Sequence, residues 1–254
     1  MADAMSPQTA DPVRAAASPA GAPVSASATV GPGEAVGLLA PPSSDLSGLM
    51  HALAGRGAMP LGLAAPLRQL VASVAASPCV LVLANTALLP WMSCLENVRV
   101  VLAQTGGERH DEPALTAQAL RLLARLGVEA LASCRPAELD VVAKHRVALA
   151  RALAAGPAVL LLDHPFTQLT GAQRAQLHAT LLNLLADGQV GVLLASDDAA
   201  EALTVCDRVL VLDGAEAAGG CWVAVPGRPA RARSVSPPSA SLVAALQHRI
   251  DTPA

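Results

Sequence analysis

The sequence predicts an α/β protein built on a mostly parallel sheet that is flanked by helices. Two observations lead to this prediction: short, uninterrupted apolar runs recur along the chain, and longer stretches with apolar residues at helical spacing lie between them. Strands and helices that alternate in this way form parallel sheets covered by helices. A chain of 254 residues is long enough to bury such a core.

Five apolar runs are the predicted strands. They are short and rich in Val and Leu, and they lack the polar alternation of a half-exposed sheet, which is typical of strands buried on both faces. In chain order they are EAVGLLA at 34–40, CVLVLA at 79–84, AVLLLD at 158–163, GVLLAS at 191–196 and RVLVLD at 208–213. Ligands of such sheets usually bind where the strands end.

Four stretches between these runs are the predicted helices, at 114–128, 143–155, 171–188 and 198–206. Their apolar residues recur every three or four positions, which places them on one face of a helix. Residues 69–95 carry no charge and are long enough to span a bilayer, which takes about 20 residues. Ser, Pro, Asn and Thr interrupt that stretch, so we do not expect it to span a membrane.

The two ends of the chain differ in composition from its middle. Residues 1–23 are mostly Ala, Pro, Ser and Gly without an apolar period, which predicts a disordered leader. Residues 227–254 form a tail rich in Pro, Arg and Ser, with a short helical segment at 242–250. We therefore expect the folded domain to occupy residues 24–226.

The composition argues against two classes of function. The net charge is −3, only 15% of the residues are charged, and Lys and Arg are scattered, so we expect no nucleic-acid partner. The five cysteines are an odd number and include no Cys-x-x-Cys pair, so we expect neither a zinc site nor a redox motif. Buried free thiols are the interpretation that we prefer.

Segments along most of the chain resemble the ATP-binding subunits of ABC transporters. The similarity runs from about residue 24 to residue 250, and among importers it is closest to the nitrate, sulfonate and taurine group, with nitrate favoured. The segments that carry it are ALLPWMSCLENV at 87–98, RPAEL at 135–139, RVALARALAAGPAVLLLD at 146–163, EALTVCDRVLVLDG at 201–214 and GGCWVAVPGRPARARSV at 219–235.

This resemblance implies a P-loop NTPase-like fold with a helical subdomain inserted at about residues 92–150. It implies ATP and Mg²⁺ as cofactors, and a second ATPase subunit, identical or different, as a dimer partner. It also implies a membrane permease partner and a cytoplasmic, peripheral location on the inner face of the cell membrane. The permease-facing positions are Leu89, Pro90, Trp91 and Glu96.

The phosphate-binding loop departs from the family pattern Gly-x-x-x-x-Gly-Lys-Ser/Thr. Ala40 and Asp45 stand at the two glycine positions, Leu46 replaces the lysine, and Ser47 alone is kept. An ionised Asp45 would repel a phosphate charge at ~4 Å by about 4 kcal/mol at an effective dielectric constant of about 20, where a lysine would attract it. We therefore do not expect tight ATP binding in the manner of the family.

The other family positions have changed as well. Asp163 is kept as a possible magnesium ligand or as a cap of the next turn, while His164 replaces the glutamate that would serve as base. His164 between Asp163 and Asp197 could hold a metal or act as a base, but we prefer the interpretation that it remains from a lost site. The remaining replacements are Ala84 at the Q-loop glutamine, Asp140, Val141 and Val142 in the signature, Thr170 at the D-loop aspartate and Asp197 at the switch histidine.

Three hypotheses about function follow from these replacements. The first is an ABC-type subunit that does not hydrolyse ATP and has a structural or regulatory role beside an importer permease. The second is a stand-alone interaction or regulatory protein that keeps the fold without a permease. The third is a divergent but active transport ATPase, whose turnover would require Asp163.

Overall fold

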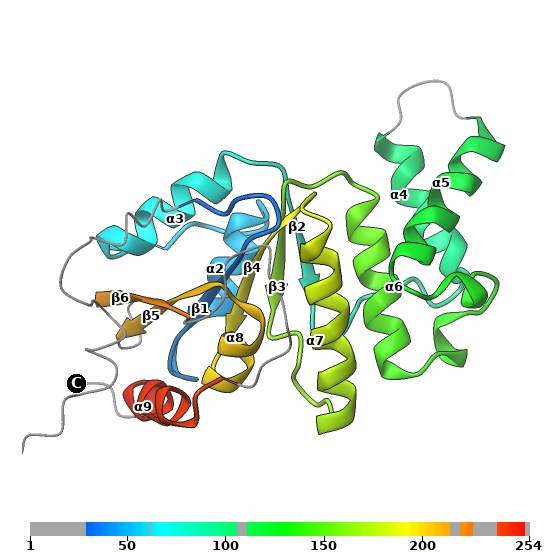
Figure 1. The fold of residues 1–254 in the computed structure, drawn as a ribbon. Helices are drawn as coiled ribbons and strands as arrows, with labels where there is room; N and C mark the ends of the chain where they lie inside the picture. The colour runs from blue at the N-terminus through cyan, green and yellow to red at the C-terminus, as the bar shows by residue number, and fades with distance from the viewer. Residues whose placement is uncertain (1–28, 61, 106–110, 214–218, 226–237, 252–254) are drawn as a thin grey trace, which may run out of the picture.

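The computed structural model describes residues 29–60, 62–105, 111–213, 219–225 and 238–251. Its centre is a six-stranded sheet with the strand order β2-β3-β4-β1-β5-β6, in which β6 alone is antiparallel to its neighbour (Figure 1). The strands are β1 (Ala35–Leu39), β2 (Cys79–Leu83), β3 (Val159–Asp163), β4 (Gly191–Ser196), β5 (Arg208–Asp213) and β6 (Gly219–Ala224). The five predicted strands and the mostly parallel sheet are confirmed.

Helices cover both faces of the sheet because alternate strand residues point in opposite directions. Leu160 and Leu162 of β3 join one apolar cluster, and Leu161 joins the other. The first cluster packs against α6 (Val141–Leu153), α7 (Gly171–Ala186), α8 (Ala199–Val205) and α9 (Ala240–Asp251). The second packs against α2 (Leu46–Leu53) and α3 (Ala65–Ala75).

Two further helices extend from the side of the sheet. α4 (Cys94–Thr105) and α5 (Glu112–Arg125) pack on each other and on α6, and in Figure 1 they lie beyond the β2 edge. Asn97 of α4 is fully buried, and its side-chain amide donates to the carbonyl oxygens of Leu89, Met92 and Ser93 at 2.9–3.2 Å. This one side chain therefore holds the segment that leads into α4 against the helix.

Three elements were missing from the prediction. α2 and α3 are helices in stretches to which we assigned no structure, and β6 begins with two glycines that conceal its strand pattern. α4 had no helical pattern assigned to it, but it lies in the range 92–150 for which the resemblance implied a helical subdomain. α3, β2 and the start of α4 divide the uncharged stretch 69–95 between them. Within the described ranges, no helix is both long and apolar enough to cross a membrane. The predicted leader at 1–23 lies outside the described residues.

Candidate functional site

A cavity of about 590 Å³ lies at the edge of the sheet where the parallel strands end. It brings together five positions that the sequence analysis singled out from distant segments: Ser47, Ala84, Asp163, His164 and Asp197. The other residues that line it are Phe166, Thr167, Gln168, Arg174, Asp198 and Glu201. The cavity is the candidate functional site, at the edge where ligands of parallel sheets bind.

The phosphate-loop position follows β1 and leads into α2, as it does in a strand–loop–helix phosphate site. The carboxylate of Asp45 caps α2 by accepting a hydrogen bond from the backbone N–H of Gly48 at 2.7 Å. A Cβ on Gly48 would lie 2.1 Å from Asp45 Oδ2, so only glycine allows this close approach. The helix N-terminus that would receive a phosphate group is therefore already capped by a negative charge from this chain.

Leu46 and Ala40 do not face the cavity. Leu46 is 4% exposed and packs in the apolar cluster beneath α2, and Ala40 is fully buried in the same cluster. The side chain at the lysine position thus points into the core. Together with the Asp45 cap, this arrangement does not fit the triphosphate of a nucleotide bound in the family manner.

Asp163 has side-chain partners on both sides. Its Oδ1 accepts a hydrogen bond from the Ser47 hydroxyl at 2.9 Å and lies 2.8 Å from Nδ1 of His164. Burial raises the pKa of the Asp163 carboxyl, but the hydrogen bonds from His164 and Ser47 outweigh burial and leave that pKa below its ordinary value. The alternative that Asp163 caps the following turn is wrong, since its contacts in the described part of the chain are with these side chains.

His164 is oriented by the same contact. Its backbone lies in the left-handed region at a φ of 45°, which is uncommon for a residue other than glycine. The hydrogen bond with Asp163 raises the pKa of the imidazole against the opposing effect of burial. Oδ1 of Asp163 serves both Ser47 and His164, so Oδ2 is the carboxylate oxygen that would be left for a cation such as Mg²⁺. Among the described residues, no three His, Cys, Asp or Glu side chains are arranged to hold a metal ion.

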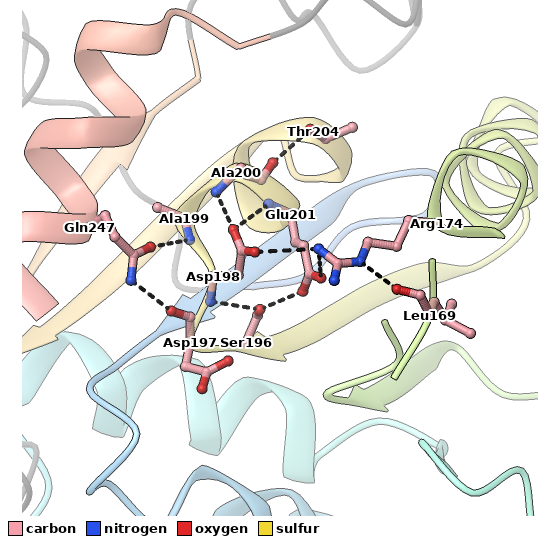
Figure 2. Close-up of polar contacts among 10 residues, drawn as sticks. All are labelled: Leu169, Arg174, Ser196, Asp197, Asp198, Ala199, Ala200, Glu201, Thr204 and Gln247. Carbon is pink, nitrogen blue, oxygen red and sulfur yellow. Dashed lines mark hydrogen bonds and ion pairs between the residues drawn. The ribbon is translucent and has the colours of Figure 1, made fainter. Parts of the chain in front are cut away.

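The far wall of the cavity is a polar network that the sequence analysis missed (Figure 2). Glu201 accepts a hydrogen bond from the Ser196 hydroxyl at 3.0 Å, and its other oxygen lies 3.5 Å from the Arg174 guanidinium. Asp198 caps α8 through the N–H groups of Ala200 and Glu201. Burial, followed by the neighbouring Asp198, raises the pKa of Glu201 to about 7.

The C-terminal helix α9 holds the loop that carries Asp197. The side-chain oxygen of Gln247 accepts from the N–H of Ala199 at 3.0 Å, and its amide donates to the carbonyl oxygen of Asp197 at 3.4 Å (Figure 2). Asp197, at the position that the resemblance assigns to the switch histidine, is half-buried and lines the cavity. No pattern in the sequence links Gln247 to this loop, because their contact depends on how α9 packs.

The signature positions lie at the start of α6, away from the cavity. Asp140 caps α6 by accepting from the N–H of Ala143 at 2.7 Å, and Val141 is 40% exposed. Val142 is 4% exposed, so its side chain is buried beneath the start of the helix. Of the three signature positions, only Asp140 and Val141 are exposed and could contact a partner subunit.

Of the four positions that were predicted to face a permease, Leu89 and Glu96 each line a surface hollow. Trp91 is 67% exposed, more than any other large apolar side chain described, and Pro90 is exposed beside it. Leu89 lines a cavity of about 400 Å³ together with Arg56 and Arg151. Glu96 lines a second cavity of about 580 Å³.

The smaller of these cavities is positively charged. Arg151 donates to the carbonyl oxygens of Ala87 and Thr86 at 2.8 and 3.2 Å. Burial lowers the pKa of Arg151, and the nearby guanidinium of Arg56 lowers it further. None of the described residues that line this cavity is acidic.

Comparison with known proteins decides the family, although no family model matches the chain. An aliphatic sulfonates import ATP-binding protein of Rhodococcus jostii is 36% identical to this chain over 188 residues, which cover 72% of this chain and 70% of that relative. This chain belongs to the family of aliphatic sulfonates import ATP-binding proteins. A second such protein of the same species is 38% identical over 129 residues, or 51% of this chain. That match spans about half of the relative's length, at 49%.

Solved ABC ATPases share the fold of this family member. An ATP-binding cassette solved as a dimer with ADP and Pi has a TM-score of 0.61 at 21% identity, covering 79% of this chain and 89% of that one. CbiO1 of Clostridium perfringens, part of an ABC transporter complex, has a TM-score of 0.60 at 18% identity, covering 77% and 79% of the two chains. The predicted P-loop NTPase-like fold class is thereby confirmed.

Proposed function

We propose that this family member is a subunit of a sulfonate-type ABC importer that does not hydrolyse ATP and has a structural or regulatory role beside the permease. The observation that carries the proposal is the start of α2. Asp45 places a carboxylate on the helix N-terminus, and Leu46 points into the core where the family lysine would reach the phosphates. Sulfonate replaces nitrate as the favoured solute because the relatives described above are sulfonate importers.

The exposed segment around Trp91 supports docking on a permease at the cytoplasmic face of the membrane. An exposed tryptophan beside an exposed proline is typical of a protein-binding surface. The cavity beside it presents Arg56 and Arg151 without an acidic neighbour in its lining. An acidic side chain on the permease would balance these two charges.

Assembly with a second ATPase subunit is the other part of the proposal. In the dimer that the family resemblance implies, the signature of one subunit faces the phosphate loop of the other. Asp140 and Val141 are exposed at the start of α6, so this chain would bring a carboxylate and a branched side chain to its partner's site. Both composite sites would therefore lack groups that a nucleotide requires.

Titration calorimetry with ATP tests the loss of nucleotide binding. We expect no heat of binding from the native chain with or without Mg²⁺. Asp45→Gly removes the competing carboxylate, and Asp45→Gly/Leu46→Lys also restores the cation. Because Leu46 is buried, the double variant must first show a native circular dichroism spectrum and a cooperative melt.

The outcomes separate the hypotheses. Binding by a folded double variant but not by the native chain supports a site lost through these two positions. Micromolar, magnesium-dependent binding by the native chain would overturn the proposal and favour an active ATPase, to be tested with Asp163→Ala. Co-purification with a permease of the sulfonate group, lost in Trp91→Ala, separates the importer subunit from a stand-alone interaction protein.

A further inference from the structure

Cys94 and Cys134 are neighbours in the fold although they are far apart in the sequence. The N–H of Cys94 donates to the carbonyl oxygen of Cys134 at 2.8 Å, and the N–H of Leu95 donates to that of Ala132 at 2.9 Å. The lengths of the bonds along this connection keep the two Cα atoms within about 7 Å of each other. Disulfides join Cα atoms that are ~4.4–6.8 Å apart, so the backbone here lies within reach of a cross-link.

The two thiols also share one environment. Cys94, the first residue of α4, is fully buried in the larger apolar cluster, and Cys134 is half-buried against the same cluster. Burial, followed by the nearby Cys134, raises the pKa of Cys94 to about 11. The electrostatic effect of one sulfur on the other is consistent with their closeness.

The remaining cysteines lie elsewhere in the fold. Cys79 is on β2 and its thiol donates to the carbonyl oxygen of Leu53 at 3.3 Å, Cys206 is buried after α8, and Cys221 is on β6. All five cysteines are free thiols in this structure. The expectation that they are uniformly buried is wrong, because Cys79, Cys134 and Cys221 are only half-buried.

We propose that Cys94 and Cys134 form an oxidation-sensitive pair that a hydroperoxide converts to an intramolecular disulfide. The half-buried Cys134 thiolate attacks the peroxide, the O–O bond breaks, and a sulfenic acid and an alcohol are formed. The Cys94 sulfur then attacks the sulfenic sulfur, the S–S bond forms, and water leaves with the proton of Cys94. Two thiols are oxidised by two electrons and one hydroperoxide is reduced to an alcohol and water.

The cross-link would fasten the first turn of α4 to the loop before the 3₁₀ turn Pro136–Glu138. It would close a loop of about 40 residues that contains α5, and a closed loop restricts the unfolded chain. It would also fix the helix start three residues after Trp91. The pair is a property of this chain alone and does not depend on docking or on nucleotide binding.

Peptide mapping after treatment with tert-butyl hydroperoxide tests the pair. Trypsin releases Cys134 in the peptide 126–144, because cleavage does not occur between Arg135 and Pro136, but it releases Cys94 together with Cys79 in 69–99. The experiment therefore uses Cys79→Ser, so that each peptide holds one thiol. We expect a 69–99/126–144 cross-linked pair that a reductant cleaves.

Matched variants decide the outcome. Cys79→Ser/Cys134→Ser should lose the cross-link, Cys79→Ser/Cys206→Ser should keep it, and the cross-linked monomer should melt several degrees above its reduced form. Over-oxidation of Cys134 to sulfinic acid while Cys94 stays alkylatable after denaturation would overturn the proposal. A disulfide that joins two Cys134 residues of separate molecules would overturn it as well.

Discussion

Replacing Glu201 with Gln should remove a pH dependence of stability that is built into the wall of the cavity. Glu201 is 8% exposed, and burial together with the neighbouring Asp198 raises its pKa from 4.5 to about 7. Each unit of pKa shift corresponds to about 1.4 kcal/mol, so the difference amounts to about 3 kcal/mol. Gln keeps an oxygen that can accept the hydrogen bond from Ser196 but carries no charge.

The sign of the effect follows from proton binding. Below about pH 4.5 the carboxyl is protonated in both the folded and unfolded states, and its contribution to stability is fully present. Between about pH 4.5 and 7 the unfolded chain loses this proton while the folded chain keeps it, so the free energy of unfolding falls as the pH rises. Above about pH 7 the loss is complete. The Gln variant should therefore be more stable than the native chain at pH 8 by up to about 3 kcal/mol, and equally stable near pH 4.5.

Urea unfolding at a series of pH values measures this difference. His164 must be controlled, because its raised pKa also makes stability fall as the pH rises through that pKa. The comparison is therefore repeated in a His164→Gln background, where the effect of Glu201→Gln should persist. A difference in unfolding free energy between native and Gln chains that stays constant from pH 5 to pH 8 would refute the reasoning.

Three other predictions concern single contacts. Gly48→Ala should lower the free energy of unfolding by about 1 kcal/mol, because the new Cβ displaces the Asp45 cap. In an Asp45→Ala background the same change should raise it by up to about 1 kcal/mol, because alanine then only improves the helix. Thermal melts of the native chain, the two single variants and the double variant test this reversal. Gln247→Ala should speed hydrogen exchange at the amide of Ala199 and lower the unfolding free energy by about 1 kcal/mol, whereas unchanged exchange would contradict the role of α9. Trp91→Ala should change stability by less than about 0.5 kcal/mol while weakening capture of the permease, and a large loss of stability would contradict its exposure.

Much of the fold was predictable because its signals are local. Each parallel strand is an unbroken apolar run, and burial on both faces requires that pattern wherever the strand lies in the sheet. β6 escaped prediction because Gly219 and Gly220 begin it, and it depends on pairing with β5 more than on its own residues.

The candidate site was predictable only in part. Strand ends placed Asp163, His164 and Asp197 at one edge of the sheet, and the structure gathers them in one cavity. Arg174 and Glu201 were missed because they lie on separate helices whose packing brings them together. Glu201 lies among the apolar residues of the predicted helix at 198–206, and an acidic residue in that setting is a sequence signal that could have identified it.

The sequence by itself therefore determined which five segments are the parallel strands, and which residues stand at the positions that the resemblance assigns to the family's catalytic groups. Tertiary structure alone decided what the replacements do: Asp45 caps α2, Leu46 enters the core, and Cys94 meets Cys134. The physical reason is the distance along the chain over which each effect acts. Apolar periodicity acts over a few neighbouring residues, whereas the orientation of a side chain and its partner across the fold depend on how separate elements pack.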